Sequence, residues 1–143
     1  DGIRDIGVTG VQTCALPIYS MLGAAHALAN PLTAAHQLVH GQAVGVMLPH
    51  VIRFNGPACG RSYADLLDDV AIAATADDAA ATLADWLTGL LAAARMKTSL
   101  AACGIDSPDV SALAADAARQ WTAGFNPRPV TAADLAGLYG AAR

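Results

Sequence analysis

Apolar residues recur with helical spacing along most of the sequence after residue 19, and short polar turns separate these runs. The clearest run covers 75–97, where Thr75 and Asp78 have the spacing of a capping box before a long helix. Leucines and a tryptophan recur every three or four positions on one face of this helix, which we expect to be buried. The members of this face are Leu83, Trp86, Leu87, Leu90 and Leu91.

Proline, glycine and capping residues mark the ends of the other predicted helices. The Asn30–Pro31 pair is expected to separate a helix over 20–29 from a short helix that ends at His40–Gly41. The Asn55–Gly56–Pro57 sequence is expected to form a turn. The remaining predicted segments are a helix over 42–54 kinked at Pro49, a helix over 63–73, a turn over 100–103 closed by Gly104, a helix over 107–120, and one over 131–139 capped by Thr131 and Asp134.

No segment has the pattern of a strand, so the sequence predicts an all-α fold, a bundle of about six to eight helices. The chain has 143 residues with 55% hydrophobic and 14% charged residues, which suits one folded domain. Acidic residues outnumber basic ones by 12 to 8 without forming runs, and we expect no nucleic-acid or membrane partner. No apolar stretch is long enough for a transmembrane helix.

The cysteines are few and widely spaced, at Cys14, Cys59 and Cys103. Their number is odd and no pair has the CxxC spacing, which favours reduced thiols over a disulfide framework. This pattern predicts a cytoplasmic protein.

Residues 1–18 resemble the translation of a short-read sequencing adapter. Asp1–Asp5 and Val8–Ile18 match it residue for residue, and Ile6 and Gly7 lie where a variable barcode would be. We therefore expect residues 1–18 to be an artefact that packs poorly against the fold. Residues 19–143 are expected to be an incomplete helical metal-binding domain that begins at an arbitrary break near Tyr19.

The histidines are His26, His36, His40 and His50, all in the first part of the authentic sequence. Imidazole is a common ligand of transition metals, and helical bundles build metal sites from side chains on facing helices. His36 and His40 are also four residues apart, a spacing found in zinc sites. The residues alone leave open whether any of these histidines is a ligand, because a hydrogen-bonded structural histidine is the commoner case.

Three segments together carry a family resemblance. In the first, His26 is followed by a Pro-Leu pair and then, fourteen residues after His26, by His40–Gly41; the second contains Leu-Pro-His-Val and Arg-Phe-Asn. The segments are Gly23–Gly41, Val46–Asn55 and Phe125–Leu135. They resemble the iron-containing (group III) alcohol dehydrogenases, and specifically the C-terminal helical domain of that family.

The resemblance implies roles for individual residues. His26 and His40 would be two of the four protein ligands of one Fe(II) ion, with Zn(II) as the alternative metal. Their rings should then face one cavity, which we expect the Asn30–Pro31 break to make possible by turning the chain back. Asn30 stands where many members have a second histidine that lines the substrate pocket. An amide does not titrate, so the proton path stays open. His36 and His50 match no ligand position and are expected to be structural.

The resemblance also implies a function for the parent protein, which would interconvert an alcohol and an aldehyde or ketone by metal-assisted hydride transfer with NAD or NADP. The other two ligands, an Asp and a His, and the N-terminal α/β cofactor domain would precede Tyr19. We therefore expect the chain alone to be inactive and the parent to act on a small molecule, with a homo-oligomer as its candidate assembly. The alternatives are a maleylacetate reductase, a hydroxyacid-oxoacid transhydrogenase, or a helical protein-binding module without catalysis.

Overall fold

The computed structural model describes residues 22–143, and this part of the chain contains helices and no strand. The all-α prediction is therefore confirmed for the described residues, which form five α-helices and two short 3₁₀ helices. In chain order these are α2 (Gly23–His36), α3 (His40–Asp68), α4 (Ala79–Ala93), η1 (Ala101–Cys103), α5 (Val110–Ala118), η2 (Trp121–Phe125) and α6 (Ala132–Ala141). The prediction about residues 1–18 lies outside the described residues.

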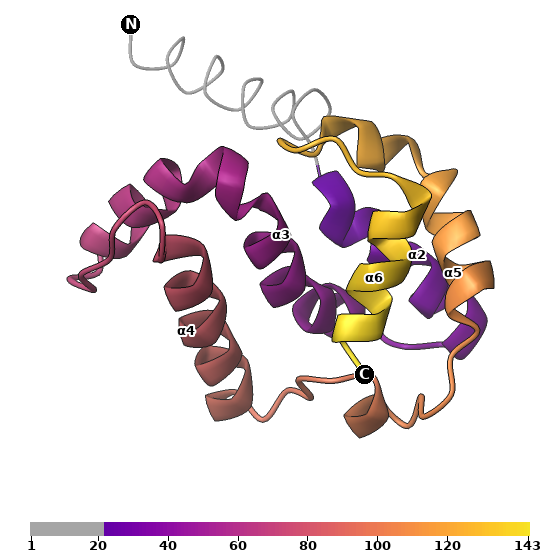
Figure 1. Cartoon of the computed structure of the whole chain (residues 1–143). Coiled ribbons are helices and arrows are strands. Elements are labelled where there is room, and N and C mark those ends of the chain that lie inside the picture. Colours follow the sequence, from indigo (N-terminus) through magenta and orange to yellow (C-terminus); the bar gives the residue numbers. More distant parts are fainter. Residues whose placement is uncertain (1–21) are drawn as a thin grey trace, which may run out of the picture.

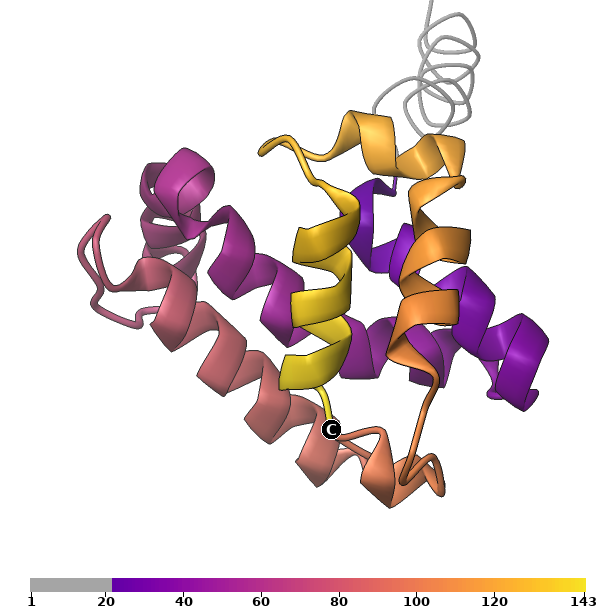
Figure 2. The ribbon, with the colours of Figure 1, turned by 45° about the vertical axis from the view of Figure 1, so that its right-hand side comes forward.

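The long helix α3 connects two apolar cores (Figure 1). In the first core, α3 packs against α2 and α6, and α5 packs against α2 and α6; in the second core, α3 packs against α4. Figure 2 shows α5 (orange) and α6 (yellow) running side by side, and they contact α2, while α6 also contacts α3. The largest fully buried side chains of the first core are Tyr139, Leu28, Leu32, Met47, Leu100 and Leu135. Leu67 and Leu83 are buried in the second core.

The predicted helix break at Asn30–Pro31 is wrong, because α2 continues through both residues to His36. Proline in a helix removes one backbone hydrogen bond and normally costs about 3 kcal/mol. Pro31 and Leu32 are both buried, and the apolar surface that they bury offsets this cost. The chain turns instead between α2 and α3, where Gln37 adopts a left-handed φ of 52°.

The predicted turn at Asn55–Gly56–Pro57 is also wrong, because α3 runs without interruption for 29 residues through Pro49 and Pro57. The glycines here allow close packing and do not form a turn. A Cβ on Gly56 would lie 2.8 Å from the Cβ of Ala80, and one on Gly60 would lie 2.1 Å from the carbonyl oxygen of Ala76. The missing side chains let the segment before α4 lie directly against α3. Helix α3 curves along its length (Figure 1).

Helix α4 is shorter than predicted and buries only part of the predicted face. It begins at Ala79, because Asp78 accepts hydrogen bonds from Thr75 in the preceding turn and does not cap the helix with its side chain. Leu83 is buried, but Trp86 is 38% and Leu90 46% exposed. A helix that packs mainly against one neighbour buries a narrow stripe, and the stripe that faces α3 is centred on Ala80, Leu83 and Ala84.

The caps of the C-terminal helices were predicted with mixed success. The capping box of α6 is confirmed, with reciprocal hydrogen bonds between Thr131 and Asp134. Helix α5 begins later than predicted, because Asp109 accepts a hydrogen bond from the Ala112 amide at 3.0 Å and is its N-cap. Gly104 closes η1 with a φ of 82°, as predicted. Of the helices within 22–143, none is long and apolar enough to cross a membrane.

Candidate metal centre

His26 and His40 lie next to each other although they belong to different helices. His26 is in the first turn of α2, and His40 is the first residue of α3. Their ring centroids are 5.3 Å apart, and the ring planes are tilted by 47°. The three-residue link between α2 and α3 turns the chain so that the ring of His40 meets the ring of His26. The two histidines that the family resemblance singles out therefore form a pair, while their role as ligands stays a prediction.

The surroundings of His26 favour a neutral imidazole. Burial lowers the pKa of His26, and the nearby His40 lowers it further, whereas the backbone carbonyl of Leu22 raises it. Metals bind the neutral ring of histidine, whose free nitrogen carries a lone pair. His26 is half-buried and His40 is exposed, so the pair lies at the surface of the described part of the chain.

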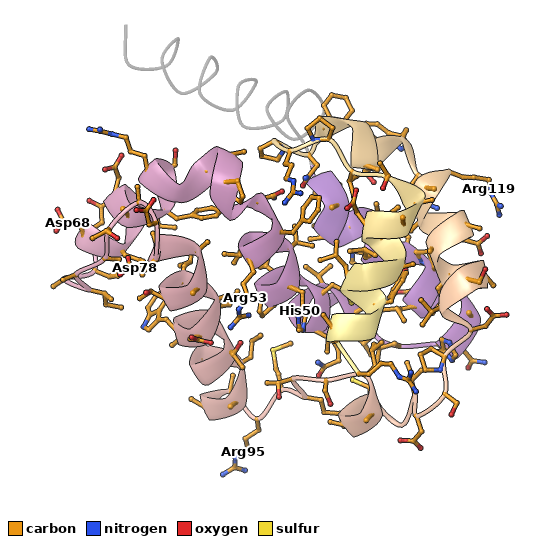
Figure 3. All side chains as sticks on the ribbon, in the orientation of Figure 1. His50, Arg53, Asp68, Asp78, Arg95 and Arg119 are labelled. Carbon is orange, nitrogen blue, oxygen red and sulfur yellow. The ribbon has the colours of Figure 1, made fainter. Side chains whose placement is uncertain are left out.

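His36 and His50 lie in other surroundings. His36 is the exposed last residue of α2, and the non-helical link between α2 and α3 separates it from His40. His36 and His40 therefore do not share a helical face. The hypothesis that their four-residue spacing forms a helical zinc pair is wrong. His50 lies beside Arg53 in a groove between α3 and α4 (Figure 3). Burial, and then the positive charge of Arg53, lower the pKa of His50.

Asn30 lies one helical turn after His26 on the same side of α2. Its side-chain amide donates a hydrogen bond to the Oε1 atom of Gln120 at 2.9 Å. Gln120 immediately precedes η2, so this bond fixes the position of η2 against α2. Sequence reasoning did not identify Gln120, because no local spacing relates two residues that are 90 positions apart.

A second amide, Asn126, contacts the first turn of α2. Its Oδ1 atom accepts a hydrogen bond from the backbone N–H of Ala24 at 3.2 Å, two residues before His26. Asn126 also pairs with Asn55 of α3, with hydrogen bonds of 3.1 and 2.7 Å between their side chains. Both asparagines lie in the segments that carry the family resemblance, which was the available signal, but sequence reasoning gave them no role.

The described residues contain no cluster of three or more His, Cys, Asp or Glu side chains that could hold a metal ion. Within 22–143, His26 and His40 can therefore offer a metal ion two ligands, one nitrogen from each ring.

Comparison with known proteins identifies the class to which this fold belongs. The model of the family "Fe-containing alcohol dehydrogenase family, C-terminal" matches residues 18–143, which is nearly the whole chain. The chain belongs to the C-terminal domain of the Fe-containing alcohol dehydrogenase family. The family predicted from the sequence is therefore confirmed.

Individual relatives agree with this assignment. The chain is 30% identical over 121 residues to lactaldehyde reductase of Escherichia coli (strain K12). It is 28% identical over 131 residues to the bifunctional aldehyde-alcohol dehydrogenase AdhE of the same strain. A crystal structure of a 1,3-propanediol oxidoreductase superposes on 85% of the chain with a TM-score of 0.79 and 28% identity. An alcohol dehydrogenase from Oenococcus oeni, 24% identical with a TM-score of 0.74, has the same fold.

The match covers only part of these relatives. It takes in 82% of this chain but 32% of the lactaldehyde reductase, and 76% of this chain but 15% of AdhE. It likewise takes in 33% of the 1,3-propanediol oxidoreductase chain.

Proposed function

We propose that this chain is the helical metal-binding part of an NAD(P)-dependent, iron-containing alcohol dehydrogenase. The observation that carries this proposal is the contact between His26 and His40, whose ring centroids are 5.3 Å apart. The family resemblance singles out these two histidines by their positions in the sequence alone. Chance would not favour a close approach of two side chains from different helices.

The distance between the rings fits a shared ion. An imidazole nitrogen binds a divalent ion at about 2.0 to 2.1 Å, so two rings on one tetrahedral ion have centroids roughly 5 Å apart. The observed separation is close to this value. Two imidazoles suit both Fe(II) and Zn(II), and we favour iron because of the family.

When bound, the metal would act as a Lewis acid that assists hydride transfer between an alcohol and the nicotinamide of NAD or NADP. His26 and His40 would hold the ion at the start of their helices. The described residues offer only these two ligands, so we propose that the remaining ligands and the cofactor site belong to the rest of the parent protein. The chain alone would then be inactive.

Asn30 is proposed to line the substrate pocket. It lies one turn from His26, its amide nitrogen donates to Gln120, and its oxygen can accept a hydrogen bond from a substrate hydroxyl. An amide cannot transfer a proton at neutral pH, so Asn30 would orient the substrate and leave the proton transfer to another group. The names of the relatives, lactaldehyde reductase and 1,3-propanediol oxidoreductase, support a small alcohol or aldehyde as the substrate.

The family match begins at residue 18. The match leaves out residues 1–17, nearly all of the segment that we propose to be adapter-derived (1–18), and it covers the whole proposed domain (19–143).

The proposed metal pair can be tested by titrating the chain with Zn²⁺ and following the histidine ring signals by NMR. We expect the signals of His26 and His40 to shift together and to saturate at one ion per chain. His26→Ala or His40→Ala should each remove this binding, whereas the control His36→Ala should keep it. The proposal fails if His36→Ala removes the binding, or if the signals of His26 and His40 shift independently.

A further inference from the structure

We infer that Asn126 is a positioning residue for the metal pair, because it holds the first turn of α2, which carries His26. This inference rests on the proposed metal site. The evidence is a network of hydrogen bonds that joins Asn126 to the start of α2 and to the middle of α3.

Within residues 22–143, the N-cap residue of α2 makes no side-chain cap hydrogen bond. Leu22 occupies the N-cap position with a left-handed φ of 74°, and its side chain cannot accept a hydrogen bond from the free amides of the helix. Asn126, which is 102 residues away in the sequence, supplies this acceptor to the Ala24 amide. The Asn126 side chain therefore caps the N-terminus of α2 from a distant part of the chain.

Gly23 has no side chain, and this leaves space for the side chain of Asn126 beside the start of α2. A Cβ at this position would lie 3.1 Å from Oδ1 of Asn126 and 3.6 Å from its Cα, and Gly23 has a φ of +40°. Both the close approach and the left-handed backbone favour glycine. The contact between the start of α2 and Asn126 therefore depends on both of its partners.

Asn126 is itself held rigidly. Its Nδ2 atom donates to the carbonyl of Arg128 at 2.6 Å and to the Asn55 side chain at 2.7 Å, so both of its hydrogens are used. The guanidinium of Arg128 donates to the Phe54 carbonyl at 2.8 Å and lies 4.0 Å from the centre of the Phe54 ring. Asn55 is only 4% exposed. A partly buried network whose donors are satisfied favours one geometry.

The network connects the two helices that carry the proposed ligands, since Asn55 belongs to α3, as does His40. A metal site requires its ligands to be held within about 0.5 Å of the productive geometry by their neighbours. Asn126 would supply this support by fixing the turn of α2 two residues from His26. It does not contact the rings, so it would act on the metal through the helix.

The test compares Asn126→Ala with Thr131→Ala, both in the full chain carrying His36→Ala. Thr131→Ala removes the capping box of α6, a local cap at another helix, and should lower the stability of the chain to a similar extent. The Zn²⁺ affinity of the histidine pair is measured by NMR and the free energy of unfolding by urea denaturation. We expect Asn126→Ala to weaken Zn²⁺ binding roughly tenfold, as for residues that support metal ligands, and Thr131→Ala to leave it unchanged.

A further variant separates positioning from general stability. Asn126→Asp keeps an acceptor for the Ala24 amide. Its Zn²⁺ affinity should therefore lie between that of Asn126→Ala and that of the chain that carries His36→Ala alone. If Asn126→Ala does not fold, Gly23→Ala displaces the same contact and should weaken binding. The inference is overturned if Asn126→Ala, or Gly23→Ala in its place, folds and binds Zn²⁺ as tightly as the chain that carries His36→Ala alone. It is also overturned if Thr131→Ala weakens Zn²⁺ binding as much as Asn126→Ala does. Failure of the metal proposal itself is seen separately: the NMR signals of His26 and His40 in the unmodified chain would then not shift together when Zn²⁺ is added.

Discussion

Tyr139 is the largest fully buried side chain of the described residues, and it links two helices through a single hydrogen bond. Its hydroxyl donates to the carbonyl of Leu28 in α2 at 2.7 Å. Burial, and to a lesser degree the carboxylate of Asp116, raise the pKa of Tyr139 well above its usual range. The folded state therefore holds this phenol in its neutral form.

Tyr139→Phe should lower the free energy of unfolding at pH 7 by about 1 kcal/mol, because the buried hydrogen bond to the Leu28 carbonyl is lost. The pH dependence should change as well. A phenol in the unfolded chain ionises near pH 10, so the stabilising effect of the raised pKa is complete below that pH and is lost as the pH rises further. Above about pH 10, the free energy of unfolding should therefore fall less steeply with pH for Tyr139→Phe than for the unmodified chain. Urea denaturation between pH 7 and 11 measures both effects, and an equal slope for the two proteins would contradict this assignment.

Single residues also show where sequence reasoning reached its limit. His26 and His40 could be selected because a family motif includes them, and the structure brings their rings close together. Asn126 and Asn55 interact across 71 positions. No periodicity or capping rule relates such distant residues, so their partnership is visible only in the fold.

Among the secondary-structure elements, glycines in α3 and α4 have opposite expected effects on stability. A Cβ on Gly60 would clash with the backbone carbonyl of Ala76, whereas a Cβ on Gly89 would meet nothing within 4 Å. Alanine favours a helix over glycine by about 1 kcal/mol at an open position. Gly89→Ala should therefore stabilise the chain by about 0.5 to 1 kcal/mol. Gly60→Ala should destabilise it by about 1 to 3 kcal/mol, because backbone must move.

Thermal denaturation of the two glycine variants measures these changes, and each variant is the control for the other. If Gly60→Ala also stabilised the chain, the close contact between α3 and the segment before α4 would not exist in solution. The contrast is informative because both glycines lie within helices.

Helix boundaries were the least predictable property of the elements. The predicted breaks at Asn30–Pro31 and Asn55–Pro57 follow from local preferences, yet both segments are helical. Burial of Pro31 and the close packing of Gly56 against Ala80 outweigh these preferences. The capping box of α6 was predicted correctly, because Thr131 and Asp134 form it from residues within one turn.

For the whole molecule, the fold class and the family could be predicted from the sequence, since helical spacing and a motif of several segments are both encoded locally. The family match across residues 18–143 favours the oxidoreductase over the alternative of an independent protein-binding module. The arrangement of α2 and α3 around the histidine pair could not be predicted, because it depends on the link after His36 and on packing between distant segments.

The most direct test of the account uses the proposed full-length dehydrogenase that contains this domain, expressed with iron. Bound iron per chain and the rate of NAD- or NADP-dependent oxidation of a short alcohol are measured for His26→Ala, His40→Ala and His36→Ala. We predict that the first two changes abolish bound iron and turnover together, that His36→Ala retains most of both, and that the 143-residue chain alone shows no turnover. Full iron binding by His26→Ala or His40→Ala, or alcohol oxidation by the short chain alone, would contradict the account.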